Sequence, residues 1–170
     1  VLIIGTYDKN GVPDAMNAAY GGLYNSGMIE FSIGHGRKTF QNIQASKAFT
    51  VSFADAANLA ASDYVGLVSS SDTPDKIRRT GWTVTPSRFV NAPLFEELPV
   101  TWECEFVRLT EEGNILGRLV NISVREDVLA EDGTVNMEKF KPLVFDHATY
   151  DYLKVDGIAG KAFEAGKCLM

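Results

Sequence analysis

The feature that most constrains the fold is a pair of segments, at 100–106 and 116–124, in which apolar residues recur at every second position over most of their length. The residues that share a face are Val100, Trp102, Cys104 and Phe106, followed by Leu116, Val120, Ile122 and Val124. Successive side chains of a strand point to opposite faces, so the pattern predicts two strands, and the glycine-containing turn at 111–114 predicts that they form a hairpin. Long alternating strands favour an antiparallel barrel or sandwich.

Shorter segments earlier in the chain fit the same class of fold. Strands are expected at 2–7, at about 13–20 and at 28–33, separated by turns at Asn10-Gly11 and 25–27, and they suggest a meander. Thr39 is the expected N-cap of a short helix that runs to about Lys47, and a further strand is expected at 49–53. Two more helices, in the alanine-rich segment 54–65 and after Thr73-Pro74, are expected to flank the sheet.

The composition sets limits on domain number and partners. With 170 residues, of which 45% are hydrophobic and 22% charged, we expect one domain over 1–170. A net charge of −6 without a basic stripe argues against a nucleic-acid partner. Apolar stretches such as 1–4 fall far short of the roughly 20 residues of a spanning helix, so no membrane partner is expected. Two widely spaced cysteines predict a cytoplasmic protein rather than a disulfide-rich secreted one.

The junction 32–39 is the most informative candidate site. It joins a predicted strand to a predicted helix through Gly34 and Gly36, and Arg37, Lys38 and the Thr39 hydroxyl follow. Backbone N–H groups at a helix start and charged donors beside them suit a phosphate group. The alternative, a capped helix with two solvated basic residues, explains the segment about equally well.

A second candidate segment is 17–22, where Asn17, Ala18, Ala19 and Tyr20 precede two glycines. Small side chains next to an aromatic one could let a flat cofactor ring lie against the strand. Glycines in strands also mark bends and close packing, and from the segment alone that alternative is favoured by roughly two to one.

Other chemistry finds little support. His35 and His147 lack the spacing of metal ligands, so no metal is inferred, and Cys104 is expected to be an inert core residue. Glu103 and Glu105 fit a solvated strand face better than an acid/base pair, although that face could lie at an oligomer contact. No G-x-G-x-x-G motif opens a helix after a strand, so any NAD(P)H would have to dock transiently.

Several short motifs in order resemble the FMN-binding split-barrel proteins, in particular flavin reductases of the flavoredoxin type. The motifs are Gly5-Thr6-Tyr7-Asp8 with Gly11, Asn17-Ala18-Ala19-Tyr20-Gly21-Gly22, Ser32-Ile33 with Arg37 and Thr39, Asp63-Tyr64-Val65-Gly66, Thr73-Pro74-Asp75-Lys76, Phe89-Val90-Asn91-Ala92-Pro93, Glu97-Leu98-Pro99, Glu103-Cys104 and Gly160-Lys161-Ala162-Phe163. The resemblance implies a mainly β fold, a Greek-key antiparallel split barrel with a few short flanking helices. It also implies a homodimer that binds FMN non-covalently near the subunit interface.

The resemblance also implies roles for individual residues. Arg37 and Thr39, with Lys38 adjacent, resemble the phosphate-binding residues, and 17–20 resembles the wall beside the flavin ring. The remaining contacts that it implies are Ser32, Ile33, Ser52, Phe53, Asp63 and Tyr64, the last two from either subunit.

The function expected from these residues is that of an oxidoreductase that passes electrons from NAD(P)H, or from a redox protein partner, to FMN, with no acid or base supplied by the protein. The alternatives are an electron-carrier module without NAD(P)H turnover and a structural relative with an empty pocket.

Overall fold

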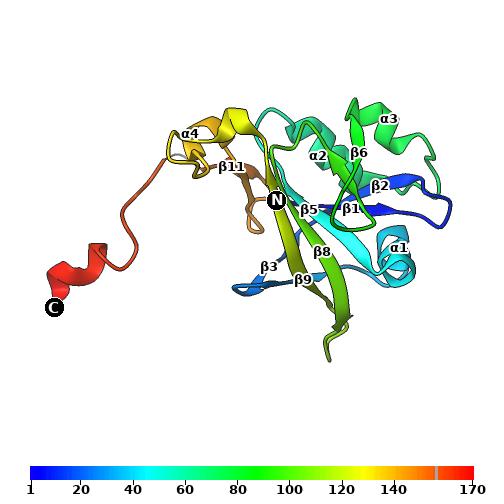
Figure 1. The fold of residues 1–170 in the computed structure, drawn as a ribbon, viewed down its shortest axis with the longest axis horizontal. Coiled ribbons are helices and arrows are strands. Elements are labelled where there is room, and N and C mark those ends of the chain that lie inside the picture. The colour runs from blue at the N-terminus through cyan, green and yellow to red at the C-terminus, as the bar shows by residue number, and fades with distance from the viewer. Residues whose placement is uncertain (156) are drawn as a thin grey trace.

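The computed structural model describes residues 1–155 and 157–170 and is built around a seven-stranded antiparallel sheet with the strand order β2-β1-β5-β8-β9-β4-β3 (Figure 1). The strands are β1 (Leu2–Tyr7), β2 (Pro13–Ala18), β3 (Tyr20–Asn25), β4 (Met28–Ser32), β5 (Ala48–Phe53), β8 (Val100–Leu109) and β9 (Ile115–Val124). The expected hairpin is present as β8 and β9, in a mainly β, split-barrel fold.

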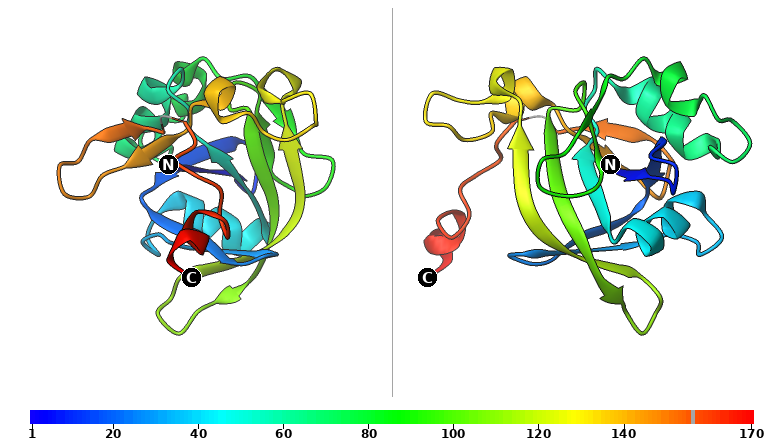
Figure 2. Two further views of the ribbon diagram at one scale, coloured as in Figure 1. Left: turned by 90° about the vertical axis from the view of Figure 1, so that its left-hand side faces the viewer. Right: turned by 45° about the vertical axis from the view of Figure 1, so that its right-hand side comes forward.

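The segment 13–25 gives the sheet its curvature. It was expected to be one strand of a meander, but it is two strands, because β2 pairs with β1 and β3 pairs with β4 at the opposite edge of the sheet. Only Ala19 separates β2 from β3, and adjacent Cα atoms lie about 3.8 Å apart. The two edges of the sheet therefore meet at Ala19, and the sheet curls into a barrel, which Figure 2 shows from two sides.

Short helices and hairpins flank the barrel. The helices are α1 (Lys38–Ser46), α2 (Leu59–Leu67), α3 (Lys76–Thr80) and α4 (Met137–Phe140), with 3-10 turns at Glu126–Val128 and Ala165–Leu169. The hairpins are β6 (Val84–Pro86) with β7 (Pro93–Phe95) and β10 (Leu143–Phe145) with β11 (Tyr152–Lys154). Residues 157–170 extend away from the barrel (Figure 1). Within the described residues, no helix combines the length and the apolar character needed to cross a membrane.

Two expected helix starts differ from the structure. The first helix begins at Lys38, with Arg37 in the N-cap position, and the Thr39 hydroxyl is bonded to Asp14 instead of capping the helix. The alanine-rich segment becomes helical only at Leu59, because the Asp55 carboxylate accepts hydrogen bonds from the backbone and side chain of Asn58 and holds a turn there.

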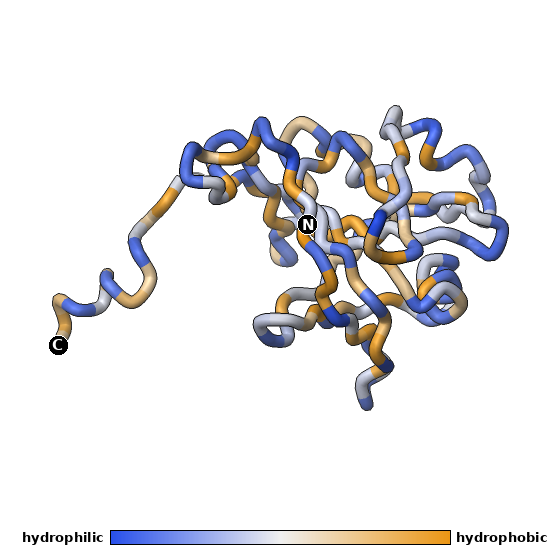
Figure 3. The backbone as a smooth tube through the Cα atoms, viewed as in Figure 1, coloured by the Kyte–Doolittle hydropathy of each residue, from blue (hydrophilic) through white to orange (hydrophobic). Residues whose placement is uncertain are grey.

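The core lies on both faces of the sheet. In β1, Leu2 and Ile4 point into the barrel, whereas Ile3 points outward to the layer formed by α2, α3 and the β6–β7 hairpin. Because both faces are covered, this strand is apolar at successive positions rather than alternating. In Figure 3 orange segments occur among the barrel strands and also in the helices, loops and C-terminal tail.

The expected apolar face of β8 is confirmed for three residues, since Trp102, Cys104 and Phe106 belong to the barrel core. Val100 packs instead with Val128 and Phe140, beyond a bulge in the β8–β9 pairing. Burial raises the pKa of Cys104 to about 12, which keeps the thiol protonated and agrees with the expected inert role.

Glu103 corrects the prediction of a solvated strand face. Its carboxylate is fully buried and accepts hydrogen bonds from the Ser87 hydroxyl, from Asn121 Nδ2 at 2.7 Å and from the Ser123 hydroxyl at 2.5 Å. Ser87 in turn accepts bonds from the backbone N–H groups of Phe89 and Val90. Glu103 therefore ties the loop after β6 to the β8–β9 hairpin.

We expect Glu103→Ala to lower the free energy of unfolding by about 3 kcal/mol or more, because three buried or half-buried donors lose their acceptor. Urea denaturation would measure the change. Glu105→Ala is the matched control on the same strand, since Glu105 pairs with exposed Arg118 and should contribute less than about 1 kcal/mol. Equal destabilisation by both variants would contradict a stabilising role for Glu103.

Candidate functional site

The candidate site begins where β4 leads into α1. The backbone N–H of Arg37 donates to the Gly34 carbonyl at 2.9 Å, and this turn places Arg37 beside the first turn of the helix. Arg37 is the N-cap residue of α1, and its side chain makes no capping hydrogen bond to the helix. Within residues 1–155 and 157–170, Arg37 forms no ion pair. The guanidinium therefore keeps its donors for another acceptor.

The buried carboxylate of Asp14, on β2, organises the floor of this site. It accepts hydrogen bonds from the Thr39 hydroxyl at 3.0 Å and the Ser70 hydroxyl at 2.5 Å, and its Oδ1 lies 3.5 Å from Lys76 Nζ. The side chains of Asp14 and Lys76 are each only 3% exposed. Burial lowers the pKa of Lys76, the attraction of Asp14 opposes that shift, and the neighbouring charge of Arg37 adds to it. The described lining of the pocket holds one carboxylate, Asp14, and the cations Arg37, Lys38 and Lys76.

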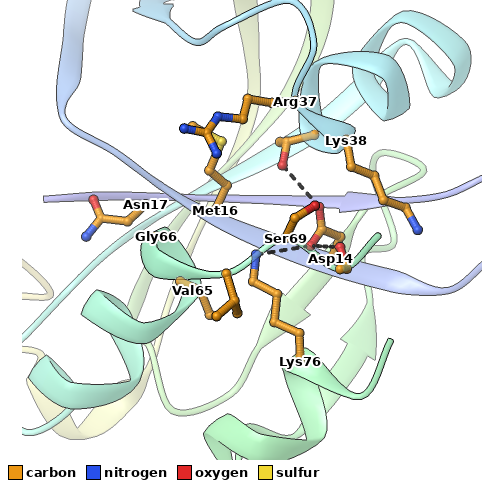
Figure 4. A pocket seen from close by; sticks show the side chains of 12 residues that line it. Asp14, Met16, Asn17, Arg37, Lys38, Val65, Gly66, Ser69 and Lys76 are labelled. Carbon is orange, nitrogen blue, oxygen red and sulfur yellow. Dashed lines mark hydrogen bonds and ion pairs between the residues drawn. The ribbon is translucent and has the colours of Figure 1, made fainter. Parts of the chain in front are cut away.

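These residues line a pocket of about 90 Å³ at the meeting of β2, α1, α2 and α3 (Figure 4). Its lining is Asp14, Met16, Asn17, Arg37, Lys38, Thr39, Val65, Gly66, Val68, Ser69, Ser70 and Lys76. The side chains of Arg37 and Lys76 reach it from opposite sides, whereas the Lys38 side chain points away and its Nζ lies 3.4 Å from Asp8. The two cations that face the pocket are thus Arg37 and Lys76.

A second pocket, of about 320 Å³, lies beside the first. It is lined by Asn17, Ala19, Asp63, Gly66, Leu67, Phe145, Tyr150 and Tyr152, and it shares Asn17 and Gly66 with the cationic pocket. A Cβ atom on Gly66 would lie 3.0 Å from the Asn17 Cβ, so a glycine lets α2 approach the strand. The two pockets lie on either side of Asn17 and Gly66, and we call them together the groove, with a cationic end and an aromatic end.

A chain of hydrogen bonds fixes Asn17 in this groove. Its amide donates to the Ser62 carbonyl and to the Tyr152 hydroxyl, both at 3.1 Å, and the Tyr152 hydroxyl donates to Asp63 at 2.8 Å. Burial, together with the hydrogen bond to Asp63 and its charge, raises the pKa of Tyr152 to about 12. The hydroxyl therefore stays protonated at neutral pH and holds the direction of both bonds.

The structure brings six of the thirteen predicted site residues to this region. Asn17, Arg37, Lys38 and Thr39 line the cationic pocket, and Asn17, Ala19 and Asp63 line the aromatic pocket. Tyr20 and Ser32 line a third hollow beside β3 and β4. The side chains of Ala18 and Ile33 are in the barrel core, and the buried Ser52 hydroxyl lies 2.7 Å from the Thr101 hydroxyl. Phe53 packs on Trp102 and Tyr64 on the outer core, so these five side chains lie away from both pockets, and ligand contact by all thirteen residues stays a prediction.

Sequence reasoning assigned no role to Asp14, Ser70 or Lys76. Lys76 stands in the Thr73-Pro74-Asp75-Lys76 motif, and Asp14 is a charged residue inside a strand, so both carried a signal. Neither signal shows that residues 14, 39, 70 and 76 meet, because that depends on the packing of α1 and α3 against β2.

The glycines after Tyr20 have different roles. A Cβ atom on Gly21 would lie 2.5 Å from the Phe31 Cβ and 2.9 Å from the Glu30 carbonyl oxygen, so close packing of β3 on β4 requires this glycine. Gly22 has open space at the same place. The interpretation of the glycines in 17–22 as a sign of close strand packing therefore holds for Gly21.

Comparison with known proteins decides the family. The model of the flavin reductase like domain matches residues 1–154. The chain belongs to this family. The flavoredoxin of Desulfovibrio vulgaris (Miyazaki F) is 31% identical, with a TM-score of 0.93 over 98% of this chain and 91% of that one. The fold is also shared with a flavoredoxin from Methanosarcina acetivorans, which is 24% identical with a TM-score of 0.89 over 100% of this chain and 91% of that one.

A further relative is an uncharacterized protein of Aquifex aeolicus (strain VF5), 27% identical over 115 residues. The match covers 63% of this chain and 56% of that protein, so the shared region is little more than half of the relative.

We expect Asp14→Asn to lower the free energy of unfolding by about 3–5 kcal/mol, because the buried Lys76 ammonium loses its charged partner. Urea denaturation at neutral pH would measure it. Asp127→Asn removes a carboxylate that pairs with Arg125 at the surface, and it should move the midpoint much less. If both variants unfold at the same urea concentration, the buried pair does not hold the site together.

Proposed function

We propose that this protein binds FMN and acts as a flavin-dependent oxidoreductase, either an NAD(P)H-dependent flavin reductase or a flavoredoxin-like electron carrier. The observation that carries the proposal is the pair of adjacent pockets, one cationic at Arg37 and Lys76 and one aromatic at Phe145 and Tyr152. The relative from Desulfovibrio vulgaris is itself a flavoredoxin, and a solved structure of Shewanella baltica with the same fold is described as an FMN-binding domain.

The donor set of the cationic pocket fits a phosphate monoester. Arg37, which pairs with no carboxylate in the described part of the chain, offers a planar fork of N–H groups, Lys76 adds an ammonium and Ser69 a hydroxyl. Asp14 holds Thr39, Ser70 and Lys76 in fixed positions. We infer that the pocket is organised before the phosphate arrives, which lowers the entropic cost of binding.

The flavin ring would lie along the junction of β2 and β3. Each of these strands is an edge of the sheet and has one side without a ladder partner, so its outward N–H and C=O groups are free to bond a heteroaromatic ring. Ala18 and Ala19 leave room for a flat ring beside the backbone, and Tyr20 ends the junction. Bound FMN would supply the redox chemistry, accepting hydride or single electrons at the ring.

The protein's part is to bind and orient the ring, and no side chain is needed as an acid or base. We place NAD(P)H, or a redox protein, as a transient electron donor at the open side of the groove. Among the described residues, no cluster of three or more metal-ligating side chains is found.

Flavin titration followed by reduction would test the function. We expect added FMN to bind and its absorbance near 450 nm to bleach with NADH or NADPH. Bleaching by dithionite alone, with no oxidation of NADH or NADPH, would assign the protein to the electron carriers instead. Protein that stays colourless in excess FMN would overturn both versions of the proposal.

We expect Arg37→Ala to raise the dissociation constant for FMN about 10- to 100-fold, as loss of a charged hydrogen bond to phosphate costs about 1.5–3 kcal/mol. Flavin fluorescence titration would measure it. Riboflavin, which has no phosphate, should bind the variant and the unchanged protein equally well, and Arg88→Ala, in a different pocket, is the matched control. Unchanged FMN affinity in Arg37→Ala would place the phosphate elsewhere.

We also propose a homodimer. Apolar side chains are exposed on three strands at one side of the sheet, Val107 on β8, Val120 and Ile122 on β9 and, beyond β4, Leu23 and Tyr24 on β3. Exposed apolar side chains of this kind are common at interfaces. Sedimentation at micromolar concentration should give twice the monomer mass, and a stable monomer with full FMN affinity would contradict a shared site.

A further inference from the structure

Residues 157–170 form a C-terminal arm that lies apart from the barrel (Figures 1 and 2). Every residue of the arm is exposed, and the exposed fractions of Ile158, Phe163 and Leu169 are 86%, 98% and 90%. In the part of the chain that the structure describes, no side chain of the arm belongs to a hydrophobic cluster. Three large apolar side chains of the arm are therefore not buried by their own chain.

The arm has a defined backbone in spite of this exposure. It contains the 3-10 turn at Ala165–Leu169, and its hydrogen bonds within the described residues are internal, such as the one from the Ala165 N–H to the Lys161 carbonyl at 3.1 Å. Phe163 has a φ of 65°, a conformation that is costly for a bulky residue and persists only where surrounding contacts hold it. Because Phe163 is 98% exposed, its own chain does not supply those contacts.

The arm also lies within the region that superposes on related structures. The match with the flavoredoxin of Desulfovibrio vulgaris covers 98% of this chain, so it leaves out fewer residues than the arm contains. The match with the flavoredoxin from Methanosarcina acetivorans covers 100% of this chain, whereas the family model ends at residue 154, before the arm. A segment that no contact holds would not keep its position from one protein to another. The partner that holds the arm is therefore one that these proteins have in common.

A second copy of the chain meets that requirement. The arm projects from the side of the barrel toward which the turn between β3 and β4 points (Figures 1 and 2). Leu23, on β3, and Ile122, on β9, are among the exposed apolar side chains of the sheet. The arm carries two lysines and one glutamate, so its charge is opposite in sign to the net charge of −6 of the whole chain. In a two-fold dimer each arm reaches the other subunit, and the two contacts are identical.

We propose that the C-terminal arm is exchanged between two subunits, so that Phe163 and Leu169 of each arm pack on the exposed apolar side chains of β3 and β9 in a second copy of this chain. The inference rests on the proposed homodimer and is independent of flavin binding. It identifies the segment that covers these apolar side chains of the sheet.

Thiol cross-linking tests the exchange. Cys168 is exposed in the arm and Cys104 is buried, so the unchanged protein offers a single accessible thiol and should stay uncross-linked. We expect Ile122→Cys to form a covalent dimer with a short bismaleimide, through Cys168 of one chain and the introduced thiol of the other. The link should disappear in Ile122→Cys/Cys168→Ser. A link within one chain would show that the arm folds back on its own barrel, and that result, no link at all, or a link that persists without Cys168 would overturn the exchange.

Sedimentation equilibrium measures what the arm contributes to the dimer. Phe163→Ser should raise the dimer dissociation constant about 10- to 100-fold, because a buried phenylalanine side chain is lost from the interface. Val12→Ser is the matched control, since Val12 is an exposed apolar residue between β1 and β2 and should leave the constant unchanged. If Phe163→Ser and deletion of residues 157–170 both leave the dimer unchanged, the exchange is wrong and the homodimer stands. A protein that is monomeric at every concentration would overturn both, and FMN titration of the same samples tests the proposed function separately.

Discussion

The continuous segment 13–25 belongs to both edges of the sheet, and the rest of the structure depends on that constraint. Its first half pairs with β1 and its second half with β4, so the sheet must curl until its edges meet at Ala19. The same segment carries Asp14 and Asn17 into the groove and presents Tyr20 beside the β10–β11 hairpin. Barrel closure and the candidate site are therefore consequences of one strand that changes partners.

Two buried carboxylates, Glu103 and Asp14, fix loops and helices to the barrel, and they differ in the donors that bond to them. Glu103 accepts only from hydroxyl and amide donors, which fix a loop to the β8–β9 hairpin. Asp14 shares its oxygens between two hydroxyls and the Lys76 ammonium, and it lies at the surface of a pocket. A buried charge is costly unless it is paired, so each carboxylate favours one arrangement of the elements that it joins.

Residues that the sequence groups by a local signal do lie together in the structure. The strand-to-helix junction brought Arg37, Lys38 and Thr39 to a single pocket, but the Lys38 ammonium turns toward Asp8 and the Thr39 hydroxyl toward Asp14. Lys76 supplies the second cation from α3, which is remote in sequence. A residue type and its spacing reveal which groups are available, and contacts across the fold decide which way each side chain points.

The sequence by itself determined the mainly β class, the β8–β9 hairpin, the burial of Cys104 and the basic junction before α1, because alternation, turn residues and helix starts are encoded within a few neighbouring positions. Only the tertiary structure decided that the strand at 13–25 divides at Ala19, that Glu103 is buried and that the β10–β11 hairpin lines the aromatic pocket. These outcomes depend on pairing between residues far apart in the chain, and a local sequence pattern does not determine which strand or charged group becomes the partner.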